Sequence, residues 1–160
     1  MTHAIYPGSF DPITLGHVNI IERALNIFEE LTVLIAVNSE KKRLFAVEEN
    51  EELIRTVTHQ WPQVTVDHTA GLLVDYCRER GIRNAVRGLR AVTDFDAEFS
   101  MALTHRNLWC EFDTIYLMTS AEYMYLHSSI VRQVARMGGD VSKFVPASVE
   151  QALTTKFAKA

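Results

Sequence analysis

Short apolar runs alternate with longer amphipathic stretches along this chain. Residues 31–37 (Leu-Thr-Val-Leu-Ile-Ala-Val) are apolar at nearly every position, which is typical of a strand covered on both faces. Four shorter runs also predict strands, at residues 4–6, 64–67, 84–86 and 114–118. The pattern therefore predicts five short strands separated by longer segments.

The intervening segments read as helices. Val18, Ile21, Leu25 and Phe28 recur at three- and four-residue spacing and predict a core-facing stripe. Less regular patterns predict helices at residues 47–58, 72–80, 94–109, 128–137 and 146–157, the last with proline at its first position. Strand–helix alternation predicts an α/β fold whose mostly parallel sheet has helices on both faces. Ligands of such sheets bind beyond the carboxyl ends of the strands, where the strand order reverses.

Length and composition narrow the class of protein. The 160 residues suit one domain spanning 1–160, and 48% hydrophobic with 22% charged residues is ordinary globular composition. A net charge of −4 argues against nucleic acid or an anionic membrane as the main partner. Cys77 and Cys110 are interpreted as reduced core residues. With no long apolar run and no leader before the first strand pattern, we expect a cytoplasmic protein.

The loop after the first predicted strand carries the strongest chemical signal. It reads Gly-Ser-Phe-Asp-Pro-Ile-Thr-Leu-Gly-His over residues 8–17 and leads into the first predicted helix. Gly16 leaves room for a ligand near the backbone, and His17 falls in the first helical turn, where amide groups and the helix dipole favour a phosphate. Taken alone, His17 is more simply interpreted as a capping or core histidine; the surrounding motif favours the phosphate-binding role instead.

Three cationic segments follow later strands. Lys41-Lys42-Arg43 comes after the second strand, although the usual explanation of such a triplet is a solvated charge run. Arg87-Gly88-Leu89-Arg90 follows the fourth strand and offers two guanidinium groups that suit phosphate oxygens. Residues 123–132 follow the fifth strand and include Ser128 and Ser129, which could cap a helix or contact a triphosphate.

These segments together resemble a known family. The first loop resembles the signature of the nucleotidyltransferase superfamily that contains (Thr/His)-x-Gly-His, here residues 14–17. Residues 4–14, 87–92 and 139–141 are similar to the phosphopantetheine adenylyltransferase family. That resemblance implies a Rossmann-like, doubly wound, five-stranded parallel sheet with helices on both faces. It also implies ATP and 4′-phosphopantetheine as substrates, Mg²⁺ accompanying ATP, no nucleic acid or membrane partner, and a homohexamer.

The resemblance also assigns residues to roles. His17 would stabilise charge on the α-phosphate, and Lys41 and Arg90 would contact phosphate oxygens. Positions matching the family's ATP site are Ser9, Phe10, His17, Gly88, Leu89, Arg90, Glu98, Tyr123, Met124, Tyr125, Leu126, His127, Ser128 and Ser129. Positions matching its acceptor site are Ser9, Lys41, Leu73 and Arg87. No pair of carboxylates predicts a dedicated metal site, which suits an ion bound mainly by phosphates and water.

Some positions depart from the family pattern. In the second signature, Leu126 replaces Ile, His127 replaces the first Ser and Ser129 replaces Thr. Ala46 replaces a threonine that would cap the following helix, a loss worth about 1 kcal/mol. Of these departures, the sequence offers no explanation for His127.

Three other functions remain open at this stage. A sister enzyme on the same scaffold would use CTP with glycerol phosphate, or ATP with nicotinamide mononucleotide, and a substrate panel separates these. An aminoacyl-tRNA synthetase would need a longer chain and a basic surface. A catalytically silent nucleotide-binding regulator would bind ATP without releasing pyrophosphate.

Overall fold

All five strands lie in one parallel sheet. The computed structural model describes residues 2–38, 40 and 42–158. The described strands are β1 (His3–Gly8), β2 (Glu30–Ala36), β3 (Val64–Thr69), β4 (Asn84–Leu89) and β5 (Asp113–Met118). They pair in the order β3-β2-β1-β4-β5, all parallel. The predicted doubly wound α/β fold is confirmed, and the strand order reverses between β1 and β4.

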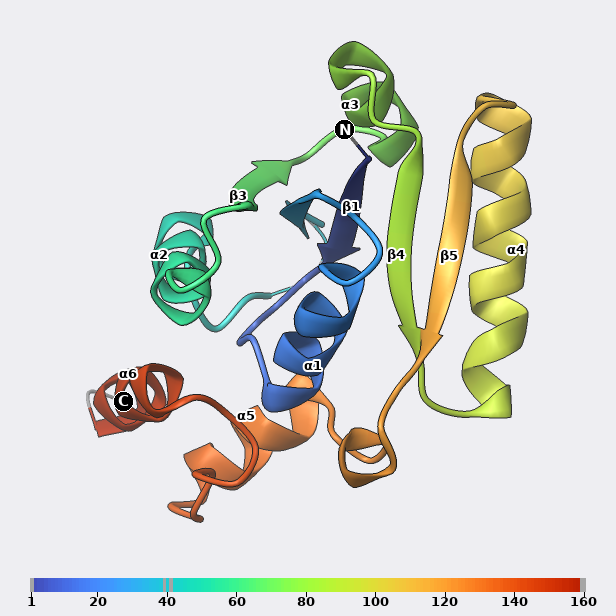
Figure 1. Ribbon diagram of the computed structural model, residues 1–160. Helices are drawn as coiled ribbons and strands as arrows, with labels where there is room; N and C mark the ends of the chain where they lie inside the picture. Colours follow the sequence, from blue (N-terminus) through green and yellow to red (C-terminus); the bar gives the residue numbers. More distant parts are fainter. Residues whose placement is uncertain (1, 39, 41, 159–160) are drawn as a thin grey trace.

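The helices begin and end close to the predicted positions. They are α1 (Leu15–Ala24), α2 (Val47–Thr58), α3 (Leu73–Arg80), α4 (Val92–Leu108), α5 (Ser128–Arg136) and α6 (Ala147–Ala158). A 3₁₀ turn, η1 (Ala121–Tyr123), was not predicted. Phe28 lies beyond the end of α1 but is still buried with the same core. Figure 1 shows α1 in front of the sheet, with α5 and α6 below the strand ends.

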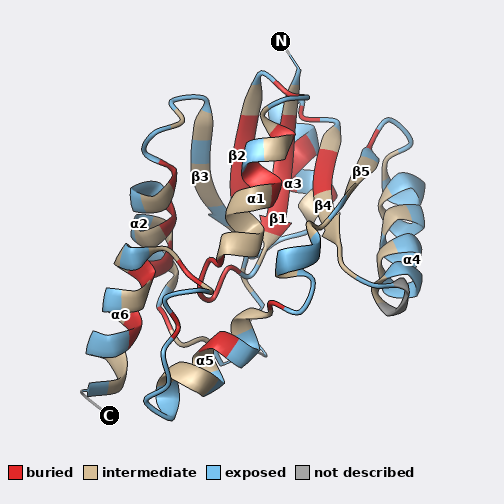
Figure 2. Cartoon of the chain, turned by 60° about the horizontal axis from the view of Figure 1, so that its bottom comes forward, coloured by how far each residue is buried: buried red, intermediate tan, exposed pale blue. Residues whose placement is uncertain are grey.

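The sheet separates two hydrophobic cores because successive strand residues face opposite sides. Ala4 and Tyr6 of β1 pack with α1, α2, α5 and α6, whereas Ile5 packs with α3 and the start of β4. Burial is deepest in the three central strands, and α4 is largely exposed on its outer side (Figure 2). The two-sided burial explains why residues 31–37 are apolar without alternation.

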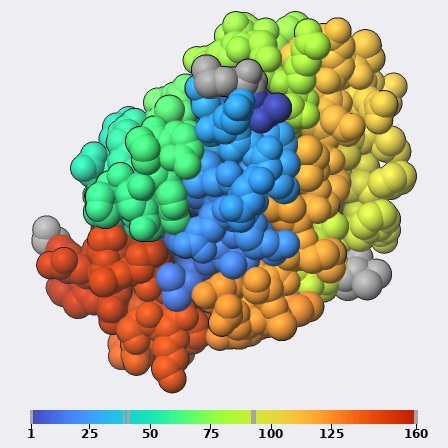
Figure 3. Space-filling view, in the orientation of Figure 1, coloured from blue at the N-terminus to red at the C-terminus, as the bar shows by residue number. Residues whose placement is uncertain are grey.

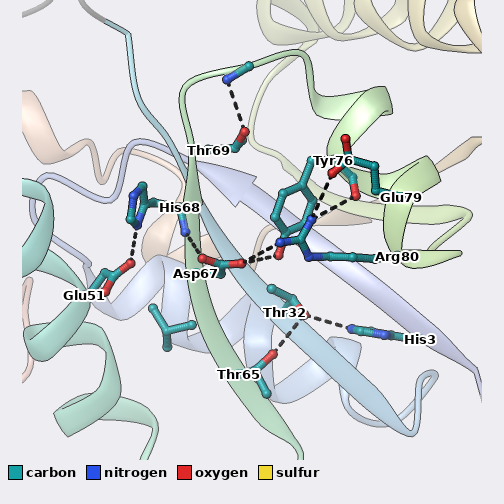
Figure 4. A network of polar contacts seen from close by, with 12 residues as sticks. His3, Thr32, Glu51, Thr65, Asp67, His68, Thr69, Tyr76, Glu79 and Arg80 are labelled. Carbon is teal, nitrogen blue, oxygen red and sulfur yellow. Dashed lines mark hydrogen bonds and ion pairs between the residues drawn. The ribbon is translucent and has the colours of Figure 1, made fainter.

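Polar side chains attach the edge strand β3 to its neighbours (Figure 4). His68 Nδ1 lies 2.6 Å from Glu51 Oε1 in α2. On the other face, Asp67 accepts a hydrogen bond of 2.7 Å from the Tyr76 hydroxyl of α3 and pairs with Arg80 at 3.6 Å. These contacts fix both adjacent helices against a strand that has a neighbour on one side only.

Two local expectations have different outcomes. Ala46 has no side-chain cap, as expected, but its backbone N–H donates to Glu49 Oε2 at 2.8 Å, which supplies half of a capping box. The interpretation of both cysteines as core residues is wrong for Cys110, which is exposed. It lies past the end of α4, where the chain turns toward β5. Cys77 is buried, and burial raises the pKa of its thiol to about 12.

One finding bears on membranes. Within residues 2–38, 40 and 42–158, no helix combines the length and apolar character that a membrane crossing requires.

Candidate active site

A cleft of about 610 Å³ opens where the strand order reverses, beyond the carboxyl ends of β1 and β4. The first loop, the segment after β2, the Arg87–Arg90 segment and residues 119–132 all line it. In Figure 3 the blue α1 lies directly beside the orange segment that follows β5. Segments far apart in the sequence thus meet at the place predicted for ligand binding.

His17 lies at the start of α1, and its ring position is fixed by a capping box. The backbone N–H of Thr14 donates to His17 Nδ1 at 3.0 Å, and the His17 N–H donates back to the Thr14 hydroxyl at 3.4 Å. Because Nδ1 accepts a backbone N–H, the proton of the neutral ring is on Nε2. His17 is therefore both the predicted cap and a residue that lines the cleft.

The environment of His17 keeps its imidazole neutral. Burial, together with the positive charges of Arg90 and Arg87, lowers the pKa of His17 to about 3. Phe10, itself buried, packs edge-on against the imidazole with ring centroids 5.0 Å apart. At neutral pH the ring therefore offers a fixed N–H donor that does not depend on protonation.

Arg87 is held by two fixed partners. Its Nη1 donates to the Pro7 carbonyl at 2.6 Å, and its Nε donates to Glu98 Oε2 at 3.0 Å, with a second contact to Glu98 Oε1. The Glu98 backbone carbonyl in turn accepts from the Tyr116 hydroxyl at 2.8 Å. The two predicted ligand-binding side chains Arg87 and Glu98 thus bind each other, so a phosphate at Arg87 competes with a carboxylate.

The second signature reaches the first loop directly. Ser128 donates its hydroxyl to the Pro12 carbonyl at 2.8 Å, so here it attaches α5 to the loop and not to its own helix. Arg132 contacts the Asp11 carbonyl and lies 3.6 Å from the Asp11 carboxylate. Asp11 also accepts the N–H groups of Leu44 and Phe45 at 2.8 and 3.0 Å. One buried carboxylate therefore connects three segments of the cleft.

Charge in the cleft is opposite in sign to that of the whole chain. Its described lining contains five cations and three carboxylates, an excess of two positive charges in a chain of net charge −4. The cations are Lys42, Arg43, Arg87, Arg90 and Arg132, and the carboxylates are Asp11, Asp94 and Glu98. The lining therefore suits an anionic ligand.

The carboxylates of the cleft do not form a metal cage. Each pairs with an arginine: Asp11 with Arg132, Asp94 with Arg90, and Glu98 with Arg87. Among described residues, Glu51, Asp67 and His68 have ligand atoms within 4.8 Å of one another, but none of them lines the cleft.

The structure brings most of the predicted residues to the cleft. The side chains or backbone of Ser9, His17, Arg87, Gly88, Arg90, Glu98, Tyr123, Leu126, His127, Ser128 and Ser129 line it. Lys41 lies outside the described residues.

Five predicted positions are not part of the lining. Phe10 supports His17 from within the core, and Leu73 packs against the second core at the start of α3. Leu89, Met124 and Tyr125 also lie outside it. The last two are exposed beside the 3₁₀ turn. The family resemblance covers runs of consecutive residues. The geometry of a strand or turn points only some of their side chains toward the cleft.

Several lining residues were not predicted. Asn38 and Thr119 each follow a strand, so the rule that ligands bind at carboxyl ends could have found them. Arg132 is the last residue of the second signature, and Lys42 and Arg43 belong to the cationic triplet already noted. Asp94 carries no such signal, because an acidic residue in the first turn of a helix is common.

Comparisons with known proteins identify the family of the chain. A family model described as cytidylyltransferase-like matches residues 5–134. The phosphopantetheine adenylyltransferase of Syntrophotalea carbinolica is 51% identical over 154 residues, covering 96% of this chain and 93% of that protein. The enzyme of the same description from Thermotoga neapolitana is 50% identical over 153 residues, covering 96% and 95%.

Solved structures of lower identity share the fold. The nicotinic acid mononucleotide adenylyltransferase of Plasmodium falciparum, complexed with NaAD, has a TM-score of 0.71 at 14% identity and covers 98% of this chain and 95% of that one. A bifunctional NMN adenylyltransferase/ADP ribose pyrophosphatase from Francisella tularensis has a TM-score of 0.75 at 16% identity and covers 99% and 50%. At such identities the likeness shows the fold alone.

The parallel sheet and the Gly-His loop at its switch point therefore define a nucleotidyltransferase of the cytidylyltransferase-like family. Within that family, the chain belongs to the phosphopantetheine adenylyltransferases, since relatives so named are about half identical over nearly its whole length.

Proposed function

We propose that this chain transfers the adenylyl group of ATP to 4′-phosphopantetheine, with dephospho-CoA and pyrophosphate as products. The observation that carries the proposal is the neutral, fixed imidazole of His17 in the same cleft as Arg87 and Arg90. The family to which the chain belongs supports the choice of acceptor.

The reaction needs no protein nucleophile, because an oxygen of the acceptor's phosphate is already anionic. That oxygen attacks the α-phosphorus of ATP, the bond to the bridging oxygen breaks, and pyrophosphate leaves with the electron pair. Catalysis then consists of alignment and of stabilising the charge that develops on the transferring group. The Nε2–H of His17 donates a hydrogen bond that stabilises this charge on the α-phosphate, and Arg90 and Lys41 contact phosphate oxygens.

The other substrate contacts in this proposal follow the roles that the family resemblance assigns. Arg87 binds the acceptor's phosphate, which displaces Glu98 from the guanidinium and frees that carboxylate for a hydroxyl or amine of the nucleotide. Ser128 and Ser129 lie at the start of α5, where amide groups and the helix dipole favour the β- and γ-phosphates. Tyr123 packs against the adenine.

Magnesium enters as the partner of ATP. The cleft carboxylates are engaged by arginines, so the ion is bound mainly by phosphate oxygens and water. The enzyme is cytoplasmic under this proposal, because its substrates belong to intracellular metabolism.

We also propose that the chain forms a homohexamer, as its resemblance to the family implies. An apolar stripe on α4 supports self-association: Phe95, Phe99 and Leu103 recur every four residues and are 49%, 50% and 47% exposed. The rings of Phe95 and Phe99 stack with centroids 5.5 Å apart. Exposure of such an apolar surface to water is unfavourable. Packing it against another copy of the chain removes the surface from water.

The test is incubation of purified protein with magnesium, ATP and 4′-phosphopantetheine, followed by mass spectrometry for dephospho-CoA and an assay for pyrophosphate. Parallel reactions contain ATP with nicotinamide mononucleotide, and CTP with glycerol phosphate. We expect product from the first mixture alone. Turnover with another acceptor, or ATP binding without pyrophosphate release, contradicts the proposal.

A further inference from the structure

His127 is the residue of the second signature that departs most in chemistry from the family pattern, where serine is usual. It lines the cleft at the residue before α5. Its side chain makes no capping hydrogen bond to that helix. Instead, Nδ1 lies 2.6 Å from Nη1 of Arg90, which follows β4. The imidazole therefore belongs to the surroundings of Arg90 and not to the helix it precedes.

The direction of this hydrogen bond is fixed by chemistry. A guanidinium group can only donate, so His127 Nδ1 accepts and its ring proton is on Nε2. Burial lowers the pKa of His127, and the charge of Arg90 lowers it further, while Asp94 opposes both. Arg90 and Asp94 are the charged groups that face His127 among the described residues. At neutral pH the imidazole is thus an acceptor for Arg90.

His127 completes the support of Arg90. The guanidinium donates from Nε to Asp94 Oδ2 at 3.1 Å, and Nη1 has a longer contact with the Leu126 carbonyl at 3.4 Å. The bond to His127 is the shortest of the three. Together the contacts of described residues use Nε and Nη1 and leave Nη2 for a phosphate oxygen.

We propose that His127 is a positioning residue for adenylyl transfer: it fixes the Arg90 guanidinium, through Nδ1, in the orientation that meets the nucleotide's phosphates. The inference rests on the proposed function for its substrate but on the Arg90 contact for its mechanism. A serine at this position has a hydroxyl much closer to the backbone, so this chain supports its arginine in a way of its own.

Three variants test the inference through separate kcat and KM values for both substrates at pH 8. His127→Leu keeps bulk but removes the acceptor, and we expect kcat/KM for ATP to fall at least about tenfold, with little change in KM for 4′-phosphopantetheine. His127→Asn places an amide oxygen near Arg90 and restores most of the loss. His59→Leu, which changes an exposed histidine outside the cleft, leaves both values unchanged.

A double-mutant cycle separates positioning from direct contact with the phosphates. If His127 acts through Arg90, then His127→Leu has little further effect in an Arg90→Ala background. The same tenfold loss in both backgrounds would show that His127 contacts the nucleotide itself, and it overturns the inference. Thermal unfolding of each variant distinguishes these effects from loss of the fold.

Protonation gives a second kinetic readout. Imidazolium has no acceptor lone pair at Nδ1, so His127 loses its contact with Arg90 as the pH falls through its folded-state pKa, which lies below the ordinary value of 6.5. The ratio of kcat/KM for ATP between wild type and His127→Asn should be constant above pH 7 and should fall at lower pH. Titration of the substrates cancels in this ratio. A ratio independent of pH contradicts the inference.

The last measurement does not depend on activity. Long-range ¹H–¹⁵N NMR of the ligand-free protein should show His127 with Nδ1 unprotonated, and Arg90→Ala should allow the other tautomer. A protonated Nδ1 in the wild type contradicts the inference even if the enzyme is active. Absence of adenylyltransferase activity in the wild type would instead contradict the proposed function, and the tautomer of His127 observed by NMR would still hold.

Discussion

The imidazole of His17 has two roles that its position in α1 combines. It is the third residue of the helix, where a glutamine or glutamate usually completes a capping box, and it also lines the cleft. The cap uses Nδ1 and leaves the Nε2–H for chemistry. The two readings of His17 that the sequence left open, cap and phosphate ligand, are therefore compatible.

Substitution at His17 should separate these roles. His17→Ala removes both, so we expect turnover to fall about 100–1,000-fold and the free energy of unfolding to fall by about 1 kcal/mol. His17→Gln retains the capping box, and it should regain the stability without regaining turnover. Steady-state pyrophosphate release and urea unfolding measure the two effects. Near-normal turnover in either variant would remove His17 from the mechanism.

The lowered pKa of His17 also predicts how stability depends on pH. The unfolded chain binds a proton at its ordinary pKa of 6.5, whereas the folded protein does so only near 3. Between these values the unfolded state binds more protons, so the free energy of unfolding decreases as the pH falls. The slope from this residue is at most about 1.4 kcal/mol per pH unit.

Urea unfolding of wild type and His17→Gln at pH 7 and pH 4.5 measures that contribution. His3, His105 and His127 also have lowered pKa values, because burial disfavours their charged forms, but they are present in both proteins. We expect the wild type to lose more stability than the variant. Equal losses would mean that His17 titrates normally.

Packing between elements explains Gly88, which the sequence alone associates with phosphate binding. A Cβ at this position would lie 3.1 Å from Cγ1 and 3.2 Å from Cδ1 of Ile20. Ile20 is buried in α1, which packs against β4 here. The glycine therefore allows α1 to approach the sheet closely, and this approach brings the start of the helix to the cleft.

Gly88→Ala should accordingly destabilise the protein by about 1–2 kcal/mol, because the new Cβ would lie too close to the side chain of Ile20 and force it to shift. The reduced entropy of the unfolded chain offsets only about 0.4–1 kcal/mol of the clash. In an Ile20→Ala background the same substitution should cost less, which chemical unfolding of the four proteins would show. Additive effects contradict this account of the contact.

Hydrophobic periodicity predicted the elements well because an element buried on one or both faces requires apolar residues at a regular spacing along the sequence. The strand at residues 31–37 and the helix at 47–58 match β2 and α2 to within one residue. The 3₁₀ turn η1 was missed, since three residues are too few to show a period. Exposure of Cys110 was missed because it depends on where α4 ends against the rest of the chain.

For the molecule as a whole, the net charge of −4 is a poor guide to the ligand. Folding brings cations from three separate segments together around the cleft, so an anionic ligand there is surrounded by a local excess of positive charge. The apolar stripe on α4 lies away from this cleft, with none of its three residues in the lining. Self-association through the stripe can therefore occur without covering the site.

Sedimentation tests the proposed hexamer. We expect a species of six times the 18.2 kDa chain mass at micromolar concentration, and Phe99→Glu should shift it to smaller species by placing a charge in the apolar stripe. Thr104→Glu adds the same charge to an exposed position outside the stripe and serves as the control. Wild type that sediments as a single chain contradicts both the hexamer and the role of α4.

The sequence by itself determined the order of strands and helices, the position of the Gly-His loop and the presence of three cationic segments, because burial and local geometry act on neighbouring residues. Only the tertiary structure decided which side chains from different segments meet: that His127 accepts a hydrogen bond from Arg90 at Nδ1, that Arg87 binds Glu98, and that Phe10 faces the core. Such long-range contacts join residues up to 121 positions apart, as between Arg132 and Asp11, and depend on strand order and helix packing, which no local pattern encodes.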